Sequence, residues 1–218
     1  GILAAAAPGT VMIDSSTIDV GSAQAVHEAA KSAGFNMIDA PVSGGVIGAD
    51  AGTLTFMCGG DKDSFEKAKP ILQGMGKNIV HCGSGGLGQA TKICNNMLAG
   101  INALAAAEAM TMGERLGVSP DILYEVISTS TGRSYIFETS NPMPDVCSTS
   151  PANNKFKPGF MAKLMLKDLR LSQAAAQDAK TSTPLGAAAT AAFQQLIDSG
   201  FGDLDTSSII KVIKPESK

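Results

Sequence analysis

The periodicity of apolar residues changes near residue 84 of this 218-residue chain. Before that point, short apolar runs at 11–14, 36–40, 54–58 and 78–81 indicate buried strands. They alternate with helical patterns at about 22–33 and 61–72, and such alternation is typical of an α/β sheet. Because no strand at the start of the chain leads into a G-x-G-x-x-G turn, we expect the opening of this sheet to precede Gly1.

The second part of the chain has the pattern of helices alone. Residues 88–116 contain no proline and are apolar on most faces, which predicts one long buried helix. Ser119 and Pro120 then give an N-cap and a first helical position, and further helices are expected at 160–179, at 184–199 and near 207. The predicted fold is α/β followed by all-α, with one part at 1–84 and a helical part at 85–218 built around the long interdomain helix.

Charge and cysteine usage restrict the class of ligand. The formal charge is −3 with no run of like charges, which indicates neither a nucleic-acid surface nor a basic membrane-binding face. No apolar run reaches the roughly 18 residues of a membrane span. The four cysteines form no C-x-x-C pair and the two histidines stand far apart, so free thiols and no metal site are expected. A small polar molecule is the expected ligand.

The first candidate binding segment is Asp39-Ala-Pro-Val-Ser-Gly-Gly45, in which a predicted strand runs into Ser43, Gly44 and Gly45. Backbone N–H groups of such a turn can bind a carboxylate, since glycine leaves its amides accessible. The competing interpretation is an ordinary glycine-rich turn, because Ser-Gly pairs are common in turns. This segment by itself does not decide between the two.

The second segment is Gly85-Gly-Leu-Gly-Gln-Ala-Thr-Lys-Ile-Cys-Asn-Asn96, at the start of the long helix. Lys92 and Asn96 are four residues apart and therefore lie on one helix face. Burial of a lysine without a partner lowers its pKa from about 10.4 towards neutrality, as a general acid or base at neutral pH requires. Alternatively, Lys92 extends from the helix start to solvent with Asn96 as a neighbour.

The third segment is Lys167-Asp168 within the helix expected from Phe160 onwards. A charged pair among leucines and methionines is found on the solvated face of many helices. Taken alone, this pair favours that structural interpretation.

In this order and at these separations, the three segments resemble the β-hydroxyacid (3-hydroxy-acid) dehydrogenase family. The substrate signature D-x-P-V-S-G-G-x-x-x-A-x-x-G matches 39–52, the catalytic signature G-x-x-G-x-x-x-K-x-x-x-N matches 85–96, and the cofactor-side K-D-L matches 167–169. Asn141-Pro-Met-Pro, Lys-Ile-Cys-Asn-Asn and Ile-Asp-Ser-Ser-Thr-Ile narrow the resemblance to the hydroxyisobutyrate branch. The resemblance extends over essentially the whole chain.

The resemblance implies the fold of a Rossmann-type domain joined to a helical domain, with NAD as cofactor. It further implies the oxidation of 3-hydroxyisobutyrate to methylmalonate semialdehyde, a reaction of valine catabolism. Lys92 would be the general acid/base and Asn96 would orient the substrate, whose carboxylate Ser43, Gly44 and Gly45 would hold. The residues implied on the cofactor side are Thr17, Lys167 and Asp168.

Several alternatives remain open at this point. The substrate can be another 3-hydroxy acid, such as tartronate semialdehyde or glycerate, because the signatures are shared. The chain can also be a non-catalytic dinucleotide-binding or assembly module, or an inactive fragment of an active enzyme. The resemblance implies a homodimer or homotetramer, located in the mitochondrial matrix if eukaryotic and otherwise in the cytoplasm. The sequence does not decide between NAD and NADP.

Overall fold

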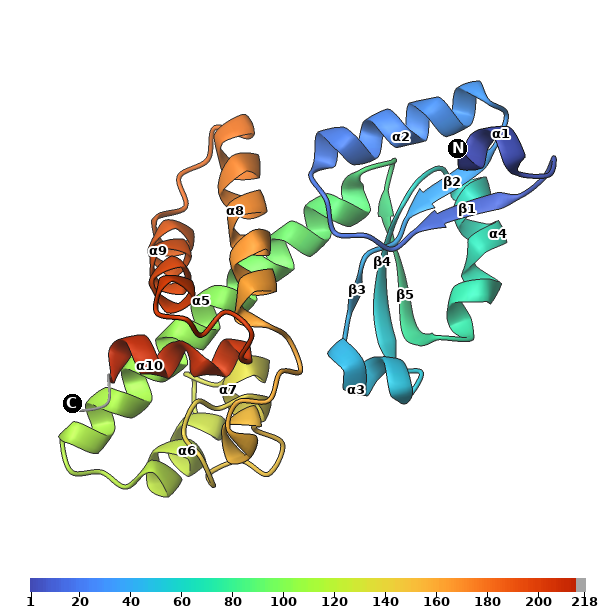
Figure 1. Ribbon diagram of the computed structural model, residues 1–218. Coiled ribbons are helices and arrows are strands. Elements are labelled where there is room, and N and C mark those ends of the chain that lie inside the picture. Colours follow the sequence, from blue (N-terminus) through green and yellow to red (C-terminus); the bar gives the residue numbers. More distant parts are fainter. Residues whose placement is uncertain (215–218) are drawn as a thin grey trace. The chain divides into compact units, whose positions relative to one another are not determined.

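The computed structural model describes residues 1–214 and divides the chain into two units, Gly1–Asn95 and Asn96–Lys218 (Figure 1). The division falls within the long helix α5, Leu87–Arg115, whereas the sequence-based boundary at 84 lies just before it. This difference has a structural cause, because the first turn of α5 is hydrogen-bonded to the sheet of the first unit.

The first unit contains a five-stranded mixed sheet. Parallel pairing joins β1 to β2 and β4 to β5, whereas β3 and the end of β2 pair with β4 in the antiparallel direction. The strands are β1 Val11–Asp14, β2 Asn36–Asp39, β3 Val42–Ser43, β4 Leu54–Gly59 and β5 Gly76–Gly83. The expected α/β character is confirmed, and the short strand β3 is an addition to the sequence-based prediction.

Two helices of the first unit pack on this sheet and begin at side-chain caps. Asp19 accepts a hydrogen bond from the Ser22 amide at the start of α2, and Asp61 does the same for the Ser64 amide at the start of α4. The core of the unit combines strand residues such as Ile38 with α4 residues such as Leu72. The helices are α1 Ile2–Ala5, α2 Val20–Ser32, α3 Gly45–Asp50 and α4 Lys62–Gln73.

The second unit is helical, as the sequence predicts. Its core packs around α5, where Gly100 permits a close approach of α8: a Cβ at Gly100 would lie 2.9 Å from a methyl group of Leu169. The elements after α5 are α6 Pro120–Ser128, α7 Tyr135–Thr139, η1 Pro151–Asn154, α8 Ala162–Asp178, α9 Pro184–Asp198, η2 Thr206–Ile209 and α10 Ile210–Ile213. The short elements α7, η1 and α10 lie outside the sequence-based expectation, because segments of four or five residues carry too little periodicity.

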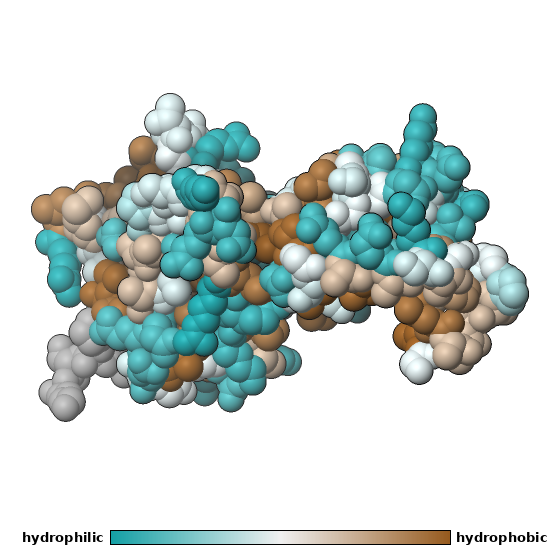
Figure 2. Space-filling model, turned by 90° about the horizontal axis from the view of Figure 1, so that it is seen from above, coloured by the Kyte–Doolittle hydropathy of each residue, from teal (hydrophilic) through white to brown (hydrophobic). Residues whose placement is uncertain are grey.

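The surface is chemically mixed. Figure 2 shows hydrophilic and hydrophobic side chains interspersed over the face that it presents. Within residues 1–214, no helix combines the length and the hydropathy required to cross a membrane.

Candidate active site

The predicted site residues Thr17 and Ser43 follow two neighbouring parallel strands. The residues of β1 and β2 pair in parallel register up to Asp14 and Asp39, so the carboxyl ends of both strands lie at the same edge of the sheet. Thr17 follows β1, and Ser43 follows β2 by four residues. In open α/β sheets, ligands bind at the carboxyl ends of the strands, so this edge is a position where a dinucleotide can bind.

Asp39, the last residue of β2, has no solvent-exposed surface and accepts three hydrogen bonds. His27 Nε2 lies 2.8 Å from Oδ1, the Gly86 amide donates to Oδ1 at 2.8 Å, and the Gln89 amide donates to Oδ2 at 2.9 Å. Burial raises the pKa of Asp39, but the hydrogen bonds from these three residues outweigh burial and hold the pKa below its ordinary value. The carboxylate therefore joins the start of α5 to the end of β2 by hydrogen bonds.

Gln89 extends this connection to the loop that carries Thr17. Its side chain is fully buried, donates from Nε2 to the Ser16 carbonyl at 2.8 Å and accepts at Oε1 from the Ile18 amide at 3.1 Å. The two backbone groups flank Thr17 on both sides. One side chain in the first turn of α5 thus fixes the conformation of the loop after β1.

The predicted carboxylate-binding turn has a backbone that requires glycine. Gly44 has a φ of 135° and Gly45 a φ of 61°, and a Cβ at Gly44 would lie 3.1 Å from a methyl group of Leu54. Ser43 pairs with Thr55 of β4, and the chain then enters the short helix α3. The expected glycine-rich connection therefore contains β3 and α3, which the sequence alone did not indicate.

Lys92 and Asn96 occupy successive turns of α5, as predicted. Lys92 is 8% exposed and Asn96 is 4% exposed, so both polar side chains are buried. The Lys92 ammonium group does not extend into open solvent, as the competing interpretation required. An ammonium and an amide four residues apart on one helix form a pair of hydrogen-bonding groups of fixed spacing.

In the second unit, Asp168 of α8 contacts two other predicted site residues. Asn96 Nδ2 donates a short hydrogen bond to Asp168 Oδ2, and both side chains are buried. Lys167 Nζ lies 3.0 Å from Asp168 Oδ1 and forms an ion pair with it. Asp168 is therefore a buried acceptor that orients Asn96, whereas Lys167 is half exposed.

Sequence reasoning overlooked three contributors to this arrangement. Asp39 is the first residue of one signature but was given no role, Gln89 is an unspecified position within another, and His27 was considered as a metal ligand and set aside. His27 instead contacts Asp39, which is a structural role. The available signal was the fixed position of Asp39 at the start of its signature, whereas no signature specifies Gln89.

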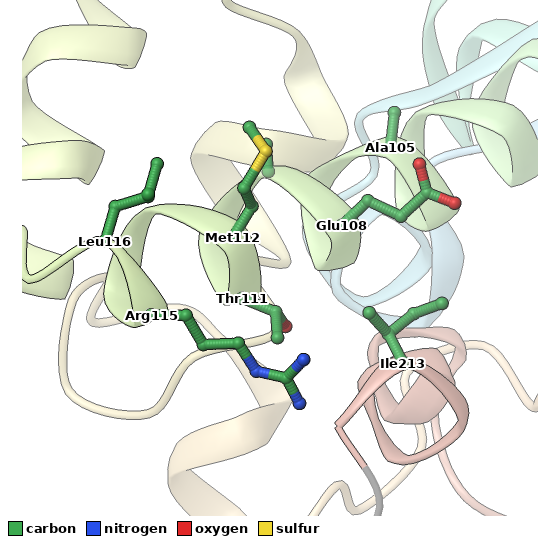
Figure 3. A pocket seen from close by; sticks show the side chains of 8 residues that line it. Ala105, Glu108, Thr111, Met112, Arg115, Leu116 and Ile213 are labelled. Atoms are coloured by element: carbon green, nitrogen blue, oxygen red, sulfur yellow. The ribbon is translucent and has the colours of Figure 1, made fainter.

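The second unit also has a pocket away from these residues. A pocket of about 550 Å³ opens on the C-terminal half of α5 and contains none of the predicted site residues (Figure 3). Its lining consists of Ala105, Glu108, Ala109, Thr111, Met112, Arg115, Leu116 and Ile213.

The cysteines and acidic residues supply no metal centre in the part of the chain that the structure describes, where no group of three metal-ligating side chains was found. All four cysteines are free thiols, and burial raises the pKa of the Cys58 thiol to about 12. Cys94 is exposed.

Comparisons with known proteins match both units. Residues 86–213 match the family model described as NAD-binding of NADP-dependent 3-hydroxyisobutyrate dehydrogenase, and residues 1–83 match the NAD binding domain of 6-phosphogluconate dehydrogenase. The chain is 45% identical to the NAD-dependent L-serine dehydrogenase of Pseudomonas aeruginosa, over 99% of this chain and 72% of that protein. It is 42% identical to the mitochondrial 3-hydroxyisobutyrate dehydrogenase of Drosophila melanogaster, over 95% of this chain and 64% of that protein.

A solved structure agrees with these sequence matches. The 3-hydroxyisobutyrate dehydrogenase of Mycobacterium tuberculosis with L-serine is 46% identical and superimposes with a TM-score of 0.92, over 97% of this chain and 72% of that one. An α/β unit, a helical unit and these matches define an NAD-linked hydroxyacid dehydrogenase. The chain belongs to the 3-hydroxyisobutyrate dehydrogenase family, which confirms the resemblance read from its signatures.

Proposed function

We propose that this chain catalyses the NAD-linked oxidation of 3-hydroxyisobutyrate to methylmalonate semialdehyde, with Lys92 as the general acid/base. The observation that carries the proposal is the buried pair on α5. Lys92 is 8% exposed and stands one helical turn before Asn96, which Asp168 orients. A buried amine beside a fixed amide is suited to proton transfer at a substrate hydroxyl.

The proposed roles of the side chains are those that the family resemblance implies. Ser43, Gly44 and Gly45 bind the substrate carboxylate through a hydroxyl and backbone amides. Asn96 hydrogen-bonds the substrate, and Lys92 Nζ takes the proton of the hydroxyl during oxidation and returns it during reduction. A carboxylate held at one end fixes the distance to the reacting carbon, which favours 3-hydroxy over 2-hydroxy acids.

NAD is proposed to bind at the carboxyl edge of β1 and β2. Thr17 supplies a hydroxyl on a loop that Gln89 fixes, and the half-exposed Lys167 supplies a cation for a phosphate or ribose group. Asp168 holds Lys167 by the charge contact at 3.0 Å. When bound, the nicotinamide accepts hydride from the carbon that carries the hydroxyl.

Loss of the Gln89 side-chain contacts is expected to weaken NAD binding about ten-fold, because the Ser16 carbonyl and the Ile18 amide lose the partner that fixes the loop carrying Thr17. Gln89→Met removes both contacts at similar length, whereas Gln89→Glu keeps the acceptor for the Ile18 amide and places a carboxylate against the Ser16 carbonyl. Calorimetric titration with NAD measures the effect. Thr91→Ala, an exposed position on the same helix turn, is the matched control; unchanged affinity in both Gln89 variants contradicts the role of the loop.

L-serine is the second candidate substrate, because the relative from Pseudomonas aeruginosa carries the name of an L-serine dehydrogenase. Both molecules are 3-hydroxy acids that differ at carbon 2, where one carries a methyl group and the other an ammonium group. Tartronate semialdehyde or glycerate is a further alternative, as is a non-catalytic binding or assembly module.

The assembly and the cellular context are also part of the proposal. We expect a homodimer or homotetramer that acts in valine catabolism. We expect the mitochondrial matrix if the source is eukaryotic, in agreement with the mitochondrial relative from Drosophila melanogaster, and the cytoplasm otherwise.

The test is NADH formation by this chain and by a version extended at its N-terminus with the nucleotide-binding segment of a relative. We expect 3-hydroxyisobutyrate to be oxidised and lactate, a 2-hydroxy acid, to be refused. A higher kcat/KM for L-serine moves the assignment to the second candidate. No NADH from any 3-hydroxy acid, in folded protein that binds NAD, supports the binding module.

A further inference from the structure

The short helix α3, which follows β3 in Figure 1, exposes two large apolar side chains directly after the turn proposed to bind the substrate carboxylate. Val46 is 60% exposed and Ile47 is 75% exposed. Within the residues that the structure describes, both lie outside the hydrophobic core of the first unit. Because apolar side chains stabilise a fold through the area that they remove from water, the fold does not require apolar residues at these two positions.

The packing of α3 directs Val46 away from the core. The helix faces Leu54 through two glycines four residues apart, because a Cβ would lie 3.1 Å from a Leu54 methyl group at Gly44 and 3.3 Å from it at Gly48. Val46 is two residues from each glycine and therefore lies on the opposite side of the helix. The Cα–Cβ bonds of a helix tilt towards its N-terminus, so the Val46 side chain leans towards the turn at Gly44 and Gly45.

The candidate substrates differ at the carbon next to the carboxylate. Carbon 2 carries a methyl group in 3-hydroxyisobutyrate, an ammonium group in L-serine and a hydroxyl group in glycerate. Carbon 2 is bonded to the carboxylate carbon, so a carboxylate held by Ser43, Gly44 and Gly45 places this substituent beside the residues that adjoin the turn. Val46 adjoins it directly, and both glycines and Val46 are exposed, so a small acid can reach them from solvent.

We propose that Val46, with Ile47 beside it, is the apolar contact for the substituent at carbon 2 and selects the methyl-bearing acid over L-serine. This inference rests on the proposed function, because it takes the carboxylate-binding turn as its fixed point. A branched hydrocarbon side chain contacts a methyl group favourably, but it offers no acceptor to an ammonium group that loses its water. Residues 40–49 carry no charged side chain, and the first carboxylate, Asp50, comes one helical turn after Val46.

The experiment compares kcat/KM for 3-hydroxyisobutyrate with kcat/KM for L-serine, in this chain or its extended version, whichever forms NADH. Val46→Thr keeps the shape of the side chain and replaces one methyl group by a hydroxyl. We expect it to lower the ratio of the two kcat/KM values about ten-fold, mainly through a higher KM for 3-hydroxyisobutyrate, because the contact exists already in the bound substrate. Val46→Asp supplies a carboxylate to the ammonium group and is expected to lower the ratio about 100-fold.

The controls separate this contact from general effects of substitution. The ratio cancels every change that affects both acids equally, such as repulsion between the carboxylate introduced by Val46→Asp and the carboxylate of the substrate. Val26→Thr makes the matched substitution at a valine of α2 that is 43% exposed, and it is expected to leave the ratio unchanged. Circular dichroism shows that each variant retains the fold.

The outcomes distinguish this inference from the proposed function. An unchanged ratio in Val46→Thr and Val46→Asp, in protein that still oxidises 3-hydroxyisobutyrate, overturns the inference and leaves the proposed function intact. A preference of the unmodified chain for L-serine, or an equal change of the ratio in Val26→Thr, overturns it as well. No NADH from any 3-hydroxy acid, with the unmodified chain in either version, overturns the proposed function and the inference together.

Discussion

Lys92→Ala is expected to lower kcat by about 10²- to 10⁴-fold in protein that forms NADH from a 3-hydroxy acid, because general acid/base catalysis contributes that range. The side chain is 8% exposed, so its loss leaves the hydroxyl proton without a nearby amine to accept it. NAD affinity is expected to stay within about two-fold, since the proposed cofactor contacts lie on Thr17 and Lys167. Steady-state kinetics and a separate NAD titration measure the two effects.

A second substitution at Lys92 and a control variant distinguish a role of this residue in proton transfer from a purely electrostatic role. Lys92→Arg retains a positive charge at the same position, but a guanidinium does not release its proton at neutral pH, so this variant is expected to be almost as slow. Lys77→Ala removes an exposed lysine from β5 and is expected to leave kcat unchanged. Near-normal turnover in the Lys92→Ala variant removes the residue from the mechanism. Full activity of Lys92→Arg together with a slow Lys92→Ala assigns the residue an electrostatic role instead of proton transfer.

Asp39→Ala is expected to lower the free energy of unfolding by about 3 kcal/mol, because a buried acceptor is removed and each buried donor left without a partner costs about 1–3 kcal/mol. The substitution leaves His27 Nε2 and the amides of Gly86 and Gln89 without their acceptor. Urea unfolding followed by circular dichroism gives the total effect. Faster hydrogen exchange at the Gln89 amide of the variant would show that the first turn of α5 unfolds locally more often.

The pH dependence of this contribution has a definite sign. The pKa of folded Asp39 lies below the ordinary value of 3.8, so the carboxylate stabilises the protein above that value. The contribution is lost as the pH falls below about 4 through the pKa of the folded state. The difference between the unmodified chain and Asp39→Ala should therefore be constant near neutrality and shrink in acid.

Asp50→Ala is the matched control for this variant, because it removes an exposed carboxylate from α3. Its effect is expected to stay within about 0.5 kcal/mol. An equal loss of free energy of unfolding in Asp39→Ala and Asp50→Ala would contradict the anchoring role of Asp39. So would a difference in stability between the unmodified chain and Asp39→Ala that grows as the pH falls.

The order and type of the longer elements are determined by the sequence itself. Helix α5 covers 29 residues, Leu87–Arg115, where the absence of proline and the apolar pattern predicted a helix at 88–116. Strand β1 begins and ends at the predicted residues, and Asp61 and Pro120 mark helix starts through capping and a fixed φ. These features depend on neighbours a few residues away, so they can be read from periodicity.

The candidate site was only partly accessible in the same way. The spacing of Lys92 and Asn96 follows from the pitch of one helix, and the signatures pointed to Ser43, Gly44 and Gly45. The burial of Lys92, however, decides between the two interpretations of this residue, a buried amine and a solvated one. Burial depends on side chains from other elements, so the sequence alone does not give it.

Only the tertiary structure decided the contacts between distant segments. The direction in which β3 and β4 pair, the bond between Asn96 and Asp168 across 72 positions, and the contacts of Gln89 with Ser16 and Ile18 all join residues far apart in the chain. No local pattern encodes which buried donor meets which acceptor. That choice is made when the elements pack and every polar group removed from water requires a partner.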